Sequence, residues 1–224
     1  MMGVIFVKTF AEPQFNISEI MRYMGSREND TLSLALAREC IEYCRNKLLY
    51  KVCYGIFPID IRNCNVDFPF MQVESCHLAK NLCRCKEAIV FAATVGLGPD
   101  RLISKYSRIS PSKALAFQSI GAERIESLCD VFCKSMEDEY SARGLFPRPR
   151  FSPGYGDFAI DAQKDIFRVL DCSKKIGLTL NNSMLMSPSK SVTAVIGLAE
   201  NKIENNFKKC TNCQNIDCCF RSDQ

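Results

Sequence analysis

The sequence predicts a mixed α/β protein whose strands pair mainly in an antiparallel manner. Two observations carry this prediction. Capped helices with apolar stripes alternate with several groups of short strands, and no regular strand–helix–strand repeat runs through the chain. A nearly continuous apolar run over residues 88–96 ends in glycine, as expected of a strand that is buried on both faces.

The N-terminal elements have clear start signals. Asn16 and Glu19 predict the cap of a first helix that ends at Gly25. Asp30 opens a second helix, which carries an apolar stripe at helical spacing: Leu34, Leu36, Ala37, Cys40, Ile41 and Cys44. The elements expected next are a strand over residues 48–61, short strands over 66–68 and 70–73, and a helix over 75–83.

The C-terminal half is organised around one long helix. A short helix is expected over residues 100–106. The long helix starts at Ser110-Pro111, with proline in its first turn, and ends before Gly144. A further helix over 161–170 and strands over 178–180 and 192–196 complete the expected fold.

Composition narrows the class of protein. With 224 residues and a net charge of +4, the chain fits one large domain, and its scattered basic residues do not indicate a nucleic-acid partner. No apolar run is long enough for a membrane helix, and the N-terminus lacks the pattern of a signal peptide. We therefore expect a cytoplasmic protein with a main domain over 1–199 and a Cys-rich tail over 200–224.

Fourteen cysteines and a single histidine set limits on the chemistry. In a cytoplasmic domain of this size the thiols are expected to be reduced. Two pairs at i,i+4 spacing, Cys40 with Cys44 and Cys129 with Cys133, fit helix core positions without a metal. His77 is the one possible imidazole base, and a structural role is favoured for it over a catalytic one.

The segment from Pro147 to Phe158 is the main candidate for a binding loop. It holds three prolines, two glycines and two arginines just before an amphipathic helix. Proline stiffens the backbone and glycine admits a ligand close to it, while Arg150 offers a planar fork of donors to a carboxylate. The alternative is an ordinary loop with solvated arginines.

Two segments, residues 150–158 (RFSPGYGDF) and 175–197 (KIGLTLNNSMLMSPSKSVTAVIG), resemble the activation domain of cobalamin-dependent methionine synthase, above all the short free-standing proteins of that family. The resemblance implies an α+β fold: a curved, C-shaped domain around a bent, mainly antiparallel sheet with flanking helices. It also implies that the domain binds S-adenosylmethionine and helps to re-methylate oxidised cobalamin. Because the chain has no cobalt-ligand motif, the cobalamin is expected on a partner, a corrinoid-binding methyltransferase protein.

The resemblance also assigns ligand-binding residues. Arg150 is expected to hold the methionine carboxylate. The residues expected to line the pocket around it are Ser152, Pro153, Gly154 and Tyr155. Glu126 and Asp130, at i,i+4 on the long helix, are candidates to complement the ligand's positive charge; the alternative is that they are solvated. The Tyr155 side chain could instead pack in the core, and capping of the following helix is the role favoured for Asp157.

The tail carries the second candidate site. Cys210, Cys213, Cys218 and Cys219 could supply thiolates to Zn²⁺ or to an iron–sulfur cluster. The alternatives are a reduced tail or a disulfide that forms on oxidation. A cluster would suit a function in which cobalamin needs an electron donor.

The leading functional hypothesis is therefore a reactivation module for a cobalamin-dependent methyltransferase. The larger family domains contribute an acidic residue and a Tyr-containing segment that have no clear match here. That departure favours the alternative, a non-catalytic protein that docks on a corrinoid protein or delivers electrons to it. A third hypothesis, an oxidoreductase using Cys210 and Cys213, depends on those two residues alone.

Overall fold

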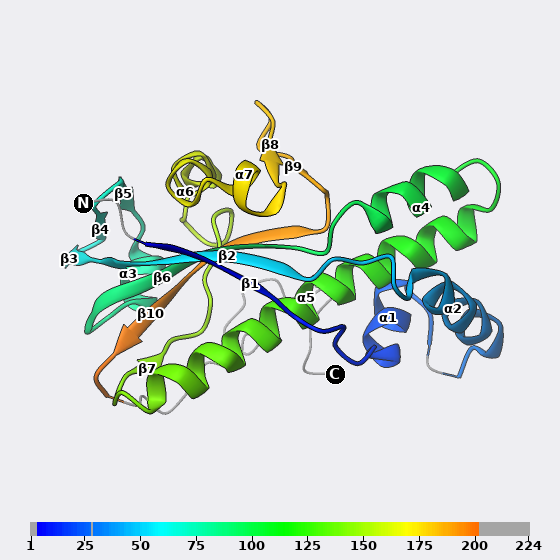
Figure 1. The fold of residues 1–224 in the computed structure, drawn as a ribbon, viewed down its shortest axis with the longest axis horizontal. Helices are drawn as coiled ribbons and strands as arrows, with labels where there is room; N and C mark the ends of the chain where they lie inside the picture. The colour runs from blue at the N-terminus through cyan, green and yellow to red at the C-terminus, as the bar shows by residue number, and fades with distance from the viewer. Residues whose placement is uncertain (1–3, 28, 202–224) are drawn as a thin grey trace.

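The computed structural model describes residues 4–27 and 29–201, and its centre is a five-stranded sheet. The strands follow the order β1-β2-β6-β10-β7, and every neighbouring pair is antiparallel. Their bounds are β1 Ile5–Thr9, β2 Lys51–Pro58, β6 Cys85–Thr94, β10 Ser191–Ala199 and β7 Phe146–Pro147. The sheet is strongly curled into a half-barrel with helices on both sides (Figure 1). The predicted fold class is confirmed.

One face of the sheet packs against the long helix. This helix, α5 (Pro111–Ser141), runs beside the sheet, with α1 (Ile17–Tyr23), α2 (Thr31–Cys44) and α4 (Gly98–Tyr106) gathered around one of its ends (Figure 1). Alternate strand residues, such as Tyr54, Phe91 and Ile196, join one apolar core with helical residues such as Phe132. Period-two alternation along the strands therefore separates this core from a second one.

The second core lies on the other face, under smaller elements. The intervening strand residues, including Cys53, Val90 and Val195, pack here. The covering elements are α3 (Cys76–Asn81), the 3₁₀ turn η1 (Ile160–Ala162), α6 (Gln163–Leu170), α7 (Cys172–Ile176) and a three-stranded sheet of β3 (Asp60–Arg62), β4 (Asn65–Phe68) and β5 (Met71–Glu74). A β8–β9 hairpin (Thr179–Leu180, Met186–Ser187) precedes β10. Since both faces are covered, β6 and β10 are apolar at nearly every position, as the sequence indicated.

Helix starts follow the expected chemistry. The Asn16 side chain accepts from the Glu19 amide, and the Asp30 side chain accepts from the amides of Leu32 and Ser33. Pro111 stands in the first turn of α5. Four short elements were not expected from the sequence: β1, β7, β9 and α7.

The cysteines are reduced with one exception among the described residues. Cys40, Cys44 and Cys129 are buried in the helical core, as expected. Cys64 and Cys76, however, form a disulfide, which corrects the expectation that all thiols are reduced. The antiparallel register of β4 with β5 pairs Asn65 with Glu74. Cys64 therefore comes to lie next to the start of α3, with its Cα atom 4.2 Å from that of Cys76.

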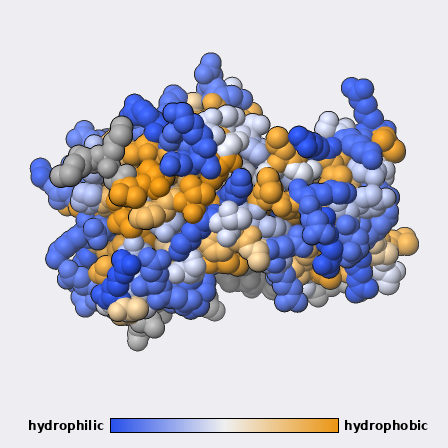
Figure 2. Space-filling model, viewed as in Figure 1, coloured by the Kyte–Doolittle hydropathy of each residue, from blue (hydrophilic) through white to orange (hydrophobic). Residues whose placement is uncertain are grey.

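The surface carries an apolar patch at the edge of the main sheet. Apolar residues gather over the region of β1 and β2, bordered by hydrophilic ones (Figure 2). Val4, Phe6 and Val7 in and beside the edge strand β1 are 69%, 43% and 46% exposed.

Within residues 4–27 and 29–201, none of the helices has the length and apolar character needed to span a bilayer.

Candidate functional site

The candidate loop begins as an irregular edge strand along β10. Pro147 pairs with Leu198 in the short strand β7, and the Arg148 amide donates to the Gly197 carbonyl at 2.8 Å. Phe151 then exchanges two backbone hydrogen bonds with Val195, each of 2.9 Å. Proline at 147 and 149 removes two donors from this edge, so pairing is confined to alternate positions. The backbone on both sides of Arg150 is therefore fixed by β10.

Arg150 reaches from this edge to one face of α5. Its Nη2 donates to Glu126 Oε2 at 2.6 Å and its Nη1 to Asp130 Oδ1 at 2.5 Å. Only 14% of the Arg150 side chain is exposed, against 47% and 71% for the two carboxylates. Burial opposes the charge on Arg150, but the neighbouring anionic groups outweigh it, so the pKa of the guanidinium lies above its ordinary value.

The structure thus brings together three residues that sequence reasoning had grouped. Glu126 and Asp130 do face the loop, at the i,i+4 spacing that places them on one side of α5. A fixed cation beside two partly exposed carboxylates forms a charge pattern of both signs. Such a pattern is chemically suited to a zwitterionic ligand, with the guanidinium toward a carboxylate and the acids toward an ammonium or sulfonium.

The rest of the loop is a compact set of turns. The Tyr155 amide donates to the Ser152 carbonyl at 3.2 Å, and the Gly154 amide donates to the Phe158 carbonyl at 2.7 Å. Gly154 and Gly156 have φ angles of +92° and +57°, which favour glycine. Pro153 and Phe158 are buried and anchor the loop.

The predicted lining residues differ in their exposure. Ser152 is half-buried, whereas Gly154 and Tyr155 stand on the surface. Tyr155 is 69% exposed, so packing of its side chain in the core is excluded. An exposed aromatic ring on a fixed turn is free to contact a ligand or a partner protein.

Asp157 does not cap the helix that follows it, which corrects the role favoured from the sequence. Its carboxylate instead accepts from the amides of Cys76 and His77, at 2.8 and 3.2 Å, and from the Ser75 hydroxyl. Ser75 is the N-cap of α3, and Cys76 and His77 are its first two residues, far from Asp157 in the sequence. The hydrogen bond from Ser75, followed in strength by those from the two amides, lowers the pKa of Asp157 below its ordinary value of 3.8.

His77 belongs to the same contact and has no catalytic setting. Its side chain is 63% exposed, with Nδ1 3.4 Å from Asp157 Oδ1. It lies beside Gly156, where a Cβ atom would collide with the imidazole ring. The structural role that the sequence favoured for His77 is therefore supported by its position against the loop.

Sequence reasoning missed the groups that α1 contributes near Glu126. Burial raises the pKa of Tyr23, and the negative charge of Glu126 raises it further. The Arg22 guanidinium lies over the Tyr23 ring, 4.6 Å from its centre. These residues are close to the candidate site because α1 packs on α5, a long-range contact that no local pattern reveals.

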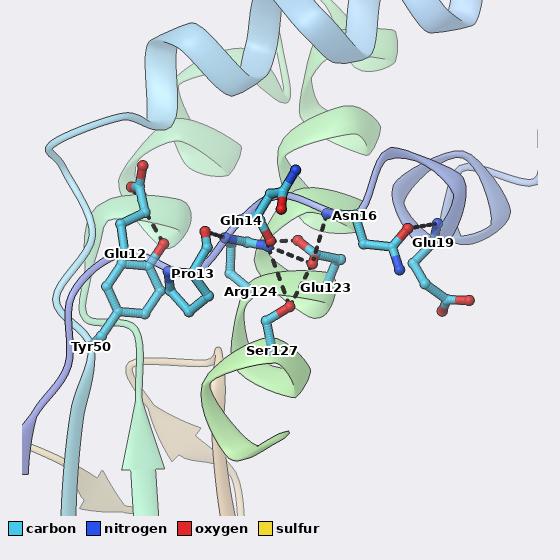
Figure 3. A network of polar contacts seen from close by, with 9 residues as sticks. All are labelled: Glu12, Pro13, Gln14, Asn16, Glu19, Tyr50, Glu123, Arg124 and Ser127. Atoms are coloured by element: carbon cyan, nitrogen blue, oxygen red, sulfur yellow. Dashed lines mark hydrogen bonds and ion pairs between the residues drawn. The ribbon is translucent and has the colours of Figure 1, made fainter. Parts of the chain in front are cut away.

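A buried arginine fixes the position of α1 (Figure 3). Arg124 donates to the carbonyls of Pro13 and Gln14 at 2.5 and 2.8 Å, and to Glu123 Oε1 at 2.5 Å. Glu123 in turn accepts from the Asn16 amide at 3.2 Å. The Arg124 and Glu123 side chains are 0% and 3% exposed. This fully paired network holds the segment before α1 on α5, so we assign it a structural role.

A cavity of about 390 Å³ lies beyond this network, outside the predicted site. Its walls are the segment before α1 and one face of α2: Glu12, Pro13, Gln14, Phe15, Ile17, Arg38, Ile41, Glu42 and Arg45.

The predicted metal ligands Cys210, Cys213, Cys218 and Cys219 lie outside the described residues. Across the part of the chain that is described, no group of three or more His, Cys, Asp and Glu side chains is placed to hold a metal ion. The tail site therefore stays a prediction from the sequence.

Comparisons with known proteins give a structural match. No family model matches the sequence, and no curated protein matches it. Among solved structures, one match is described as the crystal structure of the MetH reactivation domain bound to AdoHcy. Its TM-score is 0.63 at 12% sequence identity, over 90% of this chain and 80% of that chain. At this identity the comparison shows a shared fold, and the chain is similar to the MetH reactivation domain in its architecture.

Proposed function

We propose that this protein is a reactivation module for a cobalamin-dependent methyltransferase of the methionine synthase type, and that it binds S-adenosylmethionine beside Arg150. The single observation that carries the proposal is the cluster of Arg150 with Glu126 and Asp130 at the edge of β10. The shared fold with a domain that was crystallised with AdoHcy supports it, because AdoHcy is the demethylated form of the same ligand.

The ligand's charges match those of the cluster. The Arg150 guanidinium binds the methionine carboxylate, and Glu126 and Asp130 receive the ammonium. Binding requires that Asp130 gives up its place at Nη1. Because Asp130 is 71% exposed, its carboxylate is hydrated once it leaves, and the ligand's carboxylate takes its place beside the guanidinium, so one charged pair replaces another. Backbone groups of Ser152 to Tyr155 hold the remainder of the ligand.

The protein's own contribution is positioning. The chemistry that cobalamin supplies, on the partner protein, is acceptance of the methyl group of S-adenosylmethionine after a one-electron reduction. Arg150 and the loop from Ser152 to Asp157 fix the orientation of the sulfonium, which lowers the entropic cost of transfer. We infer that the corrinoid protein approaches on the side of Tyr155, which is exposed. We place the protein in the cytoplasm.

Titration calorimetry with S-adenosylmethionine and S-adenosylhomocysteine tests this function. We expect both ligands to bind to the wild-type protein and their affinity to be strongly weakened in Arg150→Met. Arg168→Met is the matched control, because Arg168 pairs with Asp165 on α6 and its side chain is 73% exposed. Equal affinity in both variants would contradict the assignment of Arg150.

One observation favours the alternative function, a docking or electron-delivery protein for a corrinoid protein. The Arg150 guanidinium is already engaged by two carboxylates. If neither ligand binds in the presence or absence of a corrinoid protein, while the two proteins co-elute in gel filtration, the docking function holds and the ligand-binding function does not.

A further inference from the structure

We propose that the Cys64–Cys76 disulfide is a site of thiol–disulfide exchange that a dithiol reductant opens through Cys76, and that its redox state controls the order of the loop from Ser152 to Asp157. The predicted effect on S-adenosylmethionine affinity rests on the function proposed above. The exchange itself and the change in the loop do not depend on that function.

The disulfide is open to a reductant from one side. Cys76, the first residue of α3, is exposed, and Cys64 is half-buried in the turn between β3 and β4. Other thiols of the described chain, such as Cys40, Cys44 and Cys129, are buried instead. Since exchange needs direct contact between a thiolate and a sulfur atom, the sulfur of the exposed residue Cys76 is the point of attack.

Charge selects the leaving group. The Asp157 carboxylate lies against the backbone of Cys76, where Oδ2 accepts from the Cys76 amide at 2.8 Å. A nearby negative charge disfavours a thiolate on Cys76. Attack at Cys76 avoids that cost in the first step, because Cys64 then leaves as the thiolate, and the cost falls on the second step, in which Cys76 leaves.

The exchange balances with a dithiol as the electron donor. A thiolate of the dithiol attacks Cys76 Sγ and forms a mixed disulfide, the Cys64–Cys76 bond breaks, and Cys64 leaves and takes a proton from water. The second thiol of the dithiol, deprotonated, attacks its own sulfur in the mixed disulfide and releases Cys76, which is then protonated. Two electrons and two protons pass to the cysteine pair, and the dithiol becomes a cyclic or intramolecular disulfide.

The start of α3, which the disulfide ties to Cys64 through Cys76, also holds the candidate loop. Asp157 accepts from the Ser75 hydroxyl and from the amides of Cys76 and His77. Gly156 packs so closely on His77 that a Cβ atom would not fit. The end of the loop therefore depends on the position of the first turn of α3.

Reduction loosens this turn without releasing the helix. Leu78 and Leu82 are fully buried in the second core, so they keep the rest of α3 in place. The hydrogen bond from the Ser75 amide to the Cys64 carbonyl, at 2.7 Å, and the pairing of Asn65 with Glu74 do not depend on the disulfide and remain after reduction. With the covalent tie gone, the donors to Asp157 open more often, which is a local and not a global change.

Hydrogen exchange of the full chain, followed by mass spectrometry, tests the proposal with dithiothreitol as the reductant. Alkylation of the native protein with iodoacetamide after treatment reports whether Cys64 and Cys76 have become thiols. The exchange rates to compare are those of peptides covering residues 74–82 and 151–160, before and after reduction. In Asp157→Asn the loop has already lost its charged acceptor, so reduction is expected to change the loop peptide less.

We expect dithiothreitol to reduce Cys64 and Cys76 while the protein stays folded. Hydrogen exchange in the peptides 74–82 and 151–160 should then rise on the order of tenfold, and the affinity for S-adenosylmethionine should fall by a similar factor. A pair that stays oxidised in the folded protein, or a reduced pair with unchanged exchange, overturns the proposal. The double variant Cys64→Ser/Cys76→Ser should exchange like the reduced protein and no longer respond to dithiothreitol; a response that persists assigns the effect to other cysteines and also overturns it. If no ligand binds in either state, the proposed function fails, and exchange still decides the inference.

Discussion

Replacing Arg124 with methionine tests the role of the buried network that positions α1. Arg124 is fully buried and bonds to the carbonyls of Pro13 and Gln14 and to both oxygens of Glu123. Its guanidinium also stacks on the ring of Phe15, 3.9 Å from the centre. Methionine keeps much of the apolar packing but removes every donor.

The cost follows from what the substitution leaves behind. Glu123 is 2% exposed, so it becomes a buried carboxylate that has lost its cation, and two carbonyl groups lose their partner. Breaking a buried pair by removing one partner costs about 3–5 kcal/mol, which is a large part of the 5–15 kcal/mol that stabilises a typical domain. Replacing both members, in Glu123→Gln/Arg124→Met, should cost less, because no uncompensated charge remains.

Urea unfolding followed by circular dichroism measures these differences. Arg143→Met is the control, since Arg143 pairs with Glu139 at 3.3 Å with 60% of its side chain exposed; we expect a loss below about 1 kcal/mol there. If Arg124→Met is no less stable than Arg143→Met, the argument that the network anchors α1 to α5 is wrong.

Three further predictions follow from local features. Burial raises the pKa of Cys40 to about 11, so iodoacetamide at pH 8 should leave Cys40 intact in the folded protein while it labels the exposed Cys83. Peptide mass spectrometry measures the labelling of both residues, and equal labelling contradicts the burial of Cys40. Gly156→Ala should destabilise the protein more than Gly144→Ala in urea unfolding: both glycines have positive φ, but a Cβ meets the histidine ring at 156 and open space at 144. The pKa of Asp157 is lowered in the fold, so its contribution to stability is present above pH 3.8 and disappears as the pH falls through its folded value. The difference in unfolding free energy between wild type and Asp157→Asn should therefore shrink from pH 7 to pH 3. A difference that stays constant over this range contradicts the role of Asp157 as a cap of α3.

Local signals in the sequence were sufficient for most of the fold. The caps at Asn16 and Asp30 and the proline at the start of α5 act within a few residues, so they could be recognised without the structure. The apolar run of β6 was equally clear, because a strand buried on both faces has no polar side. By contrast, β1 is a five-residue edge strand whose pairing with β2 decides its existence.

The candidate site was only partly accessible to the same reasoning. Helical spacing placed Glu126 and Asp130 on one face, and the loop containing Arg150 was evident from its proline and glycine content. That the guanidinium meets these carboxylates depends on how β7 and α5 meet, which is a tertiary contact. The cap that Asp157 provides to α3 bridges about eighty residues of sequence, so local capping rules pointed to the wrong helix.

The disulfide and the Arg124 network could not be predicted from the sequence for the same reason, because each depends on tertiary contacts. Cys64 and Cys76 come together through the register of β4 and β5. A lone arginine in a helical stretch ordinarily indicates an exposed position, and Arg124 is buried because backbone carbonyls from the segment before α1 surround it. Neither arrangement has a signal within a short window of sequence.

The most direct test of the central claim is the affinity of this protein for S-adenosylmethionine, measured by titration calorimetry on the wild type and on Arg150→Met. Loss of a charged partner to a partly buried carboxylate corresponds to about 2–4 kcal/mol, or roughly 30- to 700-fold in affinity. We expect a weakening of that size in the variant and none in Arg168→Met. An affinity that is the same in all three proteins, or no binding to the wild type with and without a corrinoid protein, would contradict the claim that this cluster is a ligand site.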